Sequence, residues 1–142
     1  MAAALLDASL CILLGVVTVA DLRERIVPDR ALAVAVAIAI PLCAMDDPTR
    51  LPERLLSGTG AGTFLLTAAL ARPGGMGLGD VKLAAVLGIY LGSAVIDALL
   101  LAFLTGAIAG LALIVRHGWR ARSRAIPFAP FLALGAFAAI VA

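Results

Sequence analysis

The sequence predicts an all-α polytopic membrane protein, with about six transmembrane helices in one compact bundle. Of the 142 residues, 63% are hydrophobic and 14% are charged, and the mean hydropathy is +1.13. These values lie outside the range of soluble domains. Because one helical span needs about 20 apolar residues, nearly the whole chain is required to cross the membrane. We therefore expect a single membrane-embedded domain over residues 1–142.

The first apolar run covers residues 4–20, and no Lys or Arg precedes it. It also contains Asp7. A cleaved signal peptide has a positively charged start before its apolar core. We therefore expect this segment to be kept as the first helix.

Further apolar runs cover residues 31–44, 55–71, 83–115 and 126–142, separated by short charged or Gly/Pro-rich connections. The run 83–115 would form a helix about 50 Å long, whereas the hydrocarbon core is about 30 Å thick. It should therefore fold back on itself. Gly92 and Ser93, with Asp97 shortly after, supply the turn, which brings the number of segments to six.

Positive charge predicts the orientation of these segments. The connections 21–30, 72–82 and 116–124 hold nine of the eleven Lys and Arg residues. An even number of crossings separates them, so all three lie on one face, which the positive-inside rule makes cytoplasmic. Both termini are then expected outside, on the membrane face opposite to the cytoplasm.

Small residues at helical spacing favour a packed bundle over isolated anchors. A glycine repeated after four residues lets two helix backbones approach closely within a membrane. A chain rich in Gly and Ala also contains such pairs without a packing role. The pairs are Gly58 and Gly62, Gly88 and Gly92, and Gly106 and Gly110.

Two carboxylates are expected at the cytoplasmic ends of membrane segments: Asp21 ends the first segment and Asp80 begins the fourth. An ionisable group at membrane depth is costly and usually faces a bundle interior or a water-filled cavity. An interfacial charge in contact with water is the alternative for either residue. For Asp80, the glycine-rich residues 73–79 favour a function, because irregular backbone near a membrane is tolerated only where protein buries it or water reaches it. The glycines beside Asp80 also let another backbone, such as an extended peptide, come close.

If Asp21 and Asp80 approach each other, they cannot both ionise easily and would share one proton. Aspartic proteases use this arrangement. The ionised carboxylate takes a proton from the attacking water, and the protonated one polarises the peptide carbonyl and later protonates the leaving amine.

At these residues the chain resembles the prepilin peptidases of the GxGD class of intramembrane aspartyl proteases. Residues 77–82, Gly-Leu-Gly-Asp-Val-Lys, match the GxGDxK motif that contains the second catalytic aspartate of that family. Residues 21–29 look like its first catalytic aspartate and the following Ile-Pro-Asn element, with Val27 and Asp29 in place of the Ile and Asn. Residues 126–135 are similar to its closing motif. The resemblance implies that Asp21 and Asp80 are catalytic and that the motif residues Gly77, Gly79, Lys82 and Pro28 surround them.

The resemblance also implies the activity: an aspartic endopeptidase that cleaves the leader of prepilin-like or pseudopilin proteins at the cytoplasmic face of the inner membrane. About ten residues without cysteine separate Asp21 from the second helix. This spacing is similar to the short, peptidase-only forms associated with tight-adherence (Flp-type) pilus assembly, so we expect no N-methyltransferase activity. The implied partners are the prepilin, membrane lipids and the pilus assembly machinery.

Two other functional classes stay open from the residues alone. A small transporter or proton-relay subunit also uses intramembrane carboxylates and broken helices, although the six segments show no internal repeat. A non-catalytic scaffold for pilus assembly would tolerate the loss of both aspartates.

We expect no metal or other cofactor, since Cys11, Cys43 and His117 have no ligand partners at suitable spacing. We expect no nucleic-acid binding either, since membrane orientation explains the basic residues 116–124. For Lys82, extension to the membrane interface is favoured over two alternatives, holding Asp80 ionised or contacting substrate, because residues two apart on a helix do not face each other.

Overall fold

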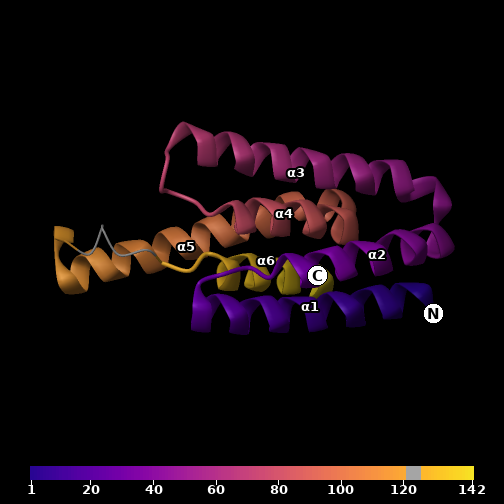
Figure 1. The fold of residues 1–142 in the computed structure, drawn as a ribbon, viewed down its shortest axis with the longest axis horizontal. Helices are drawn as coiled ribbons and strands as arrows, with labels where there is room; N and C mark the ends of the chain where they lie inside the picture. The colour runs from indigo at the N-terminus through magenta and orange to yellow at the C-terminus, as the bar shows by residue number, and fades with distance from the viewer. Residues whose placement is uncertain (121–125) are drawn as a thin grey trace.

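The computed structural model describes residues 1–120 and 126–142, which form helices joined by short connections (Figure 1). The all-α prediction is therefore confirmed. The elements are α1 (Ala2–Glu24), α2 (Asp29–Asp46), η1 (Pro48–Arg50), α3 (Leu51–Ala71), α4 (Leu78–Leu91), η2 (Gly92–Ala94), α5 (Val95–His117) and α6 (Ala129–Val141), where η marks a short 3₁₀ helix.

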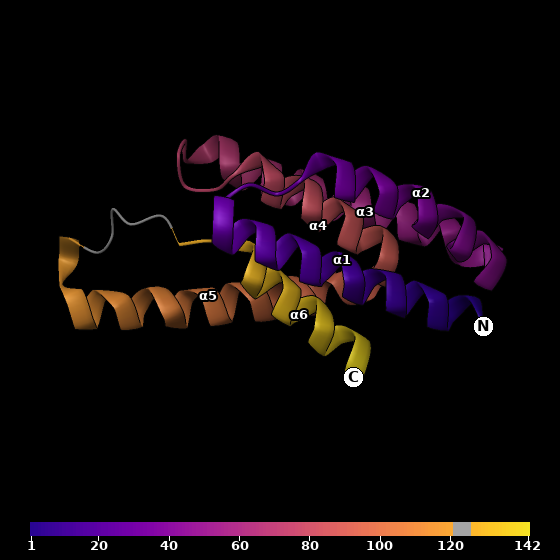
Figure 2. The ribbon, with the colours of Figure 1, turned by 60° about the horizontal axis from the view of Figure 1, so that its bottom comes forward.

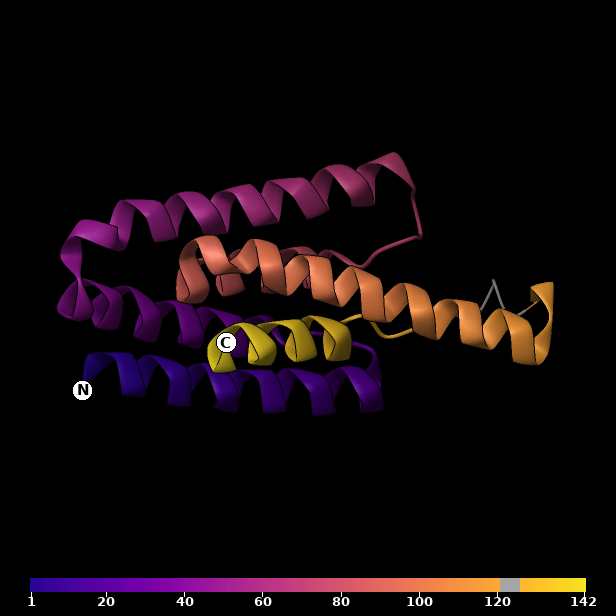
Figure 3. The same cartoon turned by 180° about the vertical axis from the view of Figure 1, so that it is seen from behind.

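Successive α-helices run in opposite directions along one long axis (Figures 1 and 3). The end of α1 and the starts of α4 and α6 consequently lie at the same end of the bundle. Helix α4 is the most central element, because it packs against α2, α3, α5 and α6. Its side chains are mostly buried from Val81 to Tyr90.

Small residues allow the two closest helix crossings. A Cβ atom on Gly88 of α4 would lie 2.4 Å from the Cα atom of Gly58 on α3. A Cβ atom on Gly135 of α6 would lie 2.1 Å from the carbonyl oxygen of Ala98 on α5. Of the predicted glycine pairs, Gly58 and Gly62 both face α4, whereas Gly92 lies at a turn and makes no such crossing.

The predicted break in the long apolar run is confirmed. The 3₁₀ turn η2 separates α4 from α5, and Gly92 begins it with φ of 61°, a backbone conformation that glycine adopts without strain. The Arg54 guanidinium from α3 donates a hydrogen bond to the carbonyl oxygen of Tyr90 near the end of α4. An arginine at this end of a helix also complements the helix dipole.

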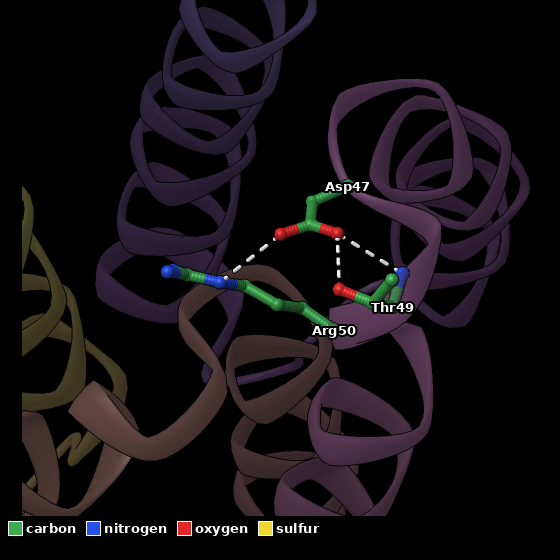
Figure 4. Close-up of polar contacts among 3 residues, drawn as sticks. All are labelled: Asp47, Thr49 and Arg50. Atoms are coloured by element: carbon green, nitrogen blue, oxygen red, sulfur yellow. Dashed lines mark hydrogen bonds and ion pairs between the residues drawn. The ribbon is translucent and has the colours of Figure 1, made fainter.

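The connection between α2 and α3 is closed by Asp47 (Figure 4). Its Oδ1 accepts hydrogen bonds from the hydroxyl and the N–H of Thr49, and its Oδ2 lies 3.2 Å from Nε of Arg50. The hydroxyl and N–H of Thr49, together with the Arg50 charge, hold the pKa of Asp47 below its ordinary value. This N-cap fixes the turn at the end of the bundle opposite to the starts of α4 and α6.

Two helical stretches among the described residues are long and apolar enough to cross a membrane: Ala2–Glu24 and the combined stretch Leu78–His117. Large apolar side chains such as Ile12, Leu104 and Ile108 are exposed on the outside of the bundle. Soluble monomers rarely expose wide apolar surface. These findings agree with a membrane protein, while six crossings and the orientation of the termini stay predictions.

The predicted basic connection 116–124 is described only in part. Helix α5 ends at His117 and projects beyond the other helices, at the end where α1 ends (Figures 1 and 2). Residues 121–125 lie outside the described part of the chain.

Candidate active site

Asp21 lies on the packed face of α1. The buried residues of this helix include Leu10, Leu14 and Val17, and Asp21 continues the same face one turn later. Its side chain is only 6% exposed. A buried carboxylate needs hydrogen-bond partners, and the backbone N–H of Ala129 donates to its Oδ2 over 3.3 Å.

The Ala129 contact joins the start of α6 to the end of α1. The N–H groups of the first helical turn have no partner within their own helix, so a carboxylate at this position serves as a cap. The resemblance of residues 126–135 to a closing motif assigns no role to Ala129. The available signal was Pro127 and Pro130, which flank a helix start.

Asp80 lies in the first turn of α4 and is partly buried. Its N–H donates to the carbonyl oxygen of Gly77 over 3.2 Å, and its carboxylate accepts a hydrogen bond from the N–H of Gly77. Gly77 is the N-cap of α4, so this exchange resembles a capping box. Gly77 has a φ of −77°, so residues other than glycine could adopt the same backbone conformation. A Cβ atom there would lie 3.7 Å from Oδ2 of Asp80, an ordinary contact.

The structure brings Asp21 and Asp80 to one end of the bundle, from helices that are far apart in the sequence. The two carboxylates are close enough for their charges to interact, and the Arg25 guanidinium also interacts with Asp21. Arg25 ends α1 in a left-handed conformation, with φ of 54°, and its N–H donates to the carbonyl oxygen of Asp21. The backbone therefore leaves the helix one turn after this aspartate.

Gly79 packs against the chain itself. A Cβ atom on Gly79 would lie 2.8 Å from the Cβ of Val27, closer than two such atoms normally approach. The sequence had suggested that this glycine admits a substrate backbone. That role stays a prediction, and the close neighbour in the structure is Val27, a buried residue of the connection between α1 and α2.

Lys82 forms an ion pair that the sequence did not predict, and its extension toward the membrane interface stays a prediction. Its Nζ donates to Oδ1 of Asp29 over 3.0 Å. Asp29 is the first residue of α2, and Pro28 before it is the N-cap, whose carbonyl oxygen accepts the N–H of Leu32. The two segments singled out in the sequence, 21–29 and 77–82, are thus in direct contact.

Two apolar grooves lie away from these aspartates. One runs between α1 and α2 and includes Ser9, Arg30 and Tyr90; the other runs between α3 and α5 and includes Phe64 and Phe103. Neither is lined by Asp21 or Asp80. Among the described residues, no group of three or more His, Cys, Asp or Glu side chains is arranged to hold a metal ion.

Comparison with known proteins identifies the family. Residues 8–114 match the model of the type IV leader peptidase family, which is three quarters of the chain and includes both aspartates. The chain belongs to the type IV leader peptidase family. No solved structure matches the chain.

Curated relatives carry the name prepilin leader peptidase/N-methyltransferase. The protein from Bacillus subtilis (strain 168) is 31% identical over 128 residues, which is 89% of this chain and 51% of the relative. Those from Aeromonas salmonicida (strain A449) and Aeromonas hydrophila are 46% and 44% identical over 68 residues, which is 47% of this chain and 23% of each relative. The matched part of this leader peptidase family member thus spans between about a quarter and half of their length.

Proposed function

We propose that this chain is an aspartyl endopeptidase that removes the leader peptide of prepilin-like proteins at the cytoplasmic face of the inner membrane. One observation carries the proposal: the buried Asp21 and the GxGD-type Asp80 lie at one end of the bundle, close enough for their charges to interact. Family membership supports the same activity.

The proposed chemistry uses the two aspartates in different roles. In a site of low dielectric, two neighbouring carboxylates are most stable when they share one proton. The ionised carboxylate removes a proton from a water molecule as its oxygen attacks the scissile carbonyl carbon. The protonated carboxyl donates a hydrogen bond to the carbonyl oxygen and later supplies the proton for the leaving amine.

The substrate follows from the names of the relatives. A prepilin leader peptidase acts on a prepilin leader, so we assign a prepilin or pseudopilin as substrate of this chain. Membrane lipids and the pilus assembly machinery are its proposed surroundings.

Of the two activities in the name of the relatives, we propose only the peptidase activity for this chain. The connection between α1 and α2 has four residues and no cysteine, which motivates the expectation that this chain does not methylate pilins.

The proposed topology has six crossings, with both termini outside. The alternating directions of the helices support it, since Asp21 and Asp80 then share a face with the basic residues Arg23, Arg72 and Arg116. Labelling of single introduced cysteines by a membrane-impermeant reagent, in a background without Cys11 and Cys43, tests this orientation. Labelling of position 24 or 75 from the outer face would contradict both topology and mechanism.

The deciding experiment follows loss of the leader from a purified prepilin in detergent. The wild-type chain is expected to cleave, whereas Asp21→Asn and Asp80→Asn are expected to be inactive. Asp97→Asn is the matched control, because Asp97 is exposed near η2 at a distance from the proposed site. Substantial cleavage by either Asn variant would show that the proposed dyad is wrong. A transporter or a scaffold would leave even the wild-type protein without activity in this assay.

A further inference from the structure

The ion pair between Lys82 and Asp29 connects the two segments that carry the proposed catalytic aspartates. Asp29 begins α2, eight residues after Asp21, and Lys82 lies in the first turns of α4, two residues after Asp80. The Nζ to Oδ1 distance is 3.0 Å. On a helix, residues two apart do not face each other, so Lys82 is directed away from Asp80 and toward α2.

This pair is a poor candidate for a purely stabilising contact. The side chains of Lys82 and Asp29 are 56% and 69% exposed. Exposed ion pairs contribute little to folding stability, since water screens the charges and two long side chains lose freedom. Its position is more informative, because it lies beside the contact between Val27 and Gly79, which joins the same two segments.

We propose that Lys82 and Asp29 are positioning residues: their ion pair holds the start of α4 against the start of α2 and thereby sets the separation of Asp21 and Asp80. This inference rests on the proposed peptidase function. Catalysis by two carboxylates and one water depends on their separation, and a displacement of about 1 Å can reduce a rate on the order of a hundredfold. The energy of this exposed pair limits how strongly it favours the productive separation, so its loss is expected to lower the rate by only a few fold.

An alternative is that Asp29 acts within its own helix, as an acidic residue in the first turn of α2 that complements the helix dipole. Two variants of Asp29 distinguish these roles by their cleavage activity. Asp29→Asn removes the charge but keeps an oxygen that accepts a hydrogen bond from Lys82 Nζ. Asp29→Leu removes both. A positioning role predicts that the Asn variant cleaves well and the Leu variant cleaves a few fold more slowly.

The test measures kcat and KM for prepilin cleavage together with the thermal midpoint of each variant in detergent. Lys82→Met and Asp29→Leu are each expected to lower kcat about three- to fivefold, with KM and the midpoint nearly unchanged. The double variant should be no slower than the slower single one, because both changes remove one contact. The exchange Lys82→Asp with Asp29→Lys should recover part of the rate. Arg23→Gln, which removes an exposed charge from the last turn of α1, is the control.

Three results would overturn the proposal: losses that multiply in the double variant, an Asn variant as slow as the Leu variant, or a fall in the thermal midpoint that accounts for the lost rate. A readout without catalysis separates this proposal from the proposed function. Asp29→Cys with Lys82→Cys, in a background without Cys11 and Cys43, should be joined by a short bifunctional thiol reagent. Efficient cross-linking together with an inactive wild-type protein would retain the contact between α2 and α4 but refute its role in catalysis. Failure to cross-link would refute the contact itself, whatever the activity.

Discussion

Gly79 and Val27 are in such close contact that a Cβ atom on Gly79 would lie 2.8 Å from the Cβ and 3.0 Å from the Cγ2 of Val27. Val27 belongs to the segment that follows Asp21, and Gly79 immediately precedes Asp80. The glycine is therefore needed where the two halves of the proposed site touch. A side chain at position 79 must push these halves apart.

This contact predicts the effect of enlarging Gly79. Gly79→Leu should abolish prepilin cleavage, and Gly79→Ala should reduce it on the order of ten- to a hundredfold, because the clash displaces one aspartate from the other. Both variants should still insert into the membrane, as measured by labelling of introduced cysteines. Val27→Gly removes the opposing Cβ and should restore part of the activity of Gly79→Ala. If Val27→Gly gives no rescue while Gly79→Ala is inactive, the space at Gly79 is used by the substrate and not by Val27.

The proposed sharing of one proton predicts non-additive losses. Asp21→Asn and Asp80→Asn should each reduce kcat on the order of a thousandfold or more, and the double variant should be scarcely slower than either, because the residues act as a unit. Binding of the prepilin, measured by co-purification with the variants, should survive. A double variant that is much slower than both single variants would contradict the shared role.

The same dyad predicts a bell-shaped dependence of kcat/KM on pH. The rate should fall at low pH, when both carboxyl groups are protonated, and at high pH, when both are ionised, since the reaction needs one of each. Initial rates measured across the acidic to neutral range check this profile. A rate that rises to a plateau, with no descending limb, would indicate that only one titrating group is required.

The crossing of α3 and α4 predicts a strong size limit at Gly88. Gly88→Val should lower the free energy of unfolding by about 1–3 kcal/mol or prevent assembly, because the added atoms meet the backbone of Gly58. Gly60→Ala is the matched control on α3, since a Cβ there meets nothing within 4 Å. In that helix interior alanine is expected to be neutral or stabilising by about 0.5–1 kcal/mol. Thermal unfolding in detergent measures both, and equal effects of the two variants would contradict the close crossing.

Asp47 predicts a pH-dependent contribution to the stability of the turn between α2 and α3. The pKa of Asp47 is held below its ordinary value by the hydroxyl and the N–H of Thr49 and by Arg50, so the folded state binds the proton less readily than the unfolded chain. The contribution is present above the ordinary pKa of about 4 and is lost as pH falls through the lower folded value. Asp47→Ala should therefore lower the thermal midpoint slightly at neutral pH and have less effect in strong acid. An undiminished difference in strong acid would exclude this ionic role.

The all-α class of the protein and the choice of Asp21 and Asp80 as candidate residues came from the sequence because both depend on local features. Hydropathy predicted an all-α membrane protein, and most of the described residues lie in helices. Helix length predicted the break at Gly92, because an uninterrupted helix would have exceeded the bilayer. The GLGD motif and the aspartate before Val27-Pro28 were visible as exceptions in apolar surroundings.

The contacts around Asp21 and Asp80 were decided only by the tertiary structure. The bond between Lys82 and Asp29 joins positions 53 residues apart, and that between Ala129 and Asp21 joins positions 108 residues apart. Such pairs depend on how far each helix is shifted along its neighbour, and this shift is set by the packing of small residues at the crossings. A local pattern places a residue on a helix face but does not specify the atom it will meet. For this reason the sequence determined which side chains are candidates for the chemistry, and the packing of the helices determined which neighbours hold them.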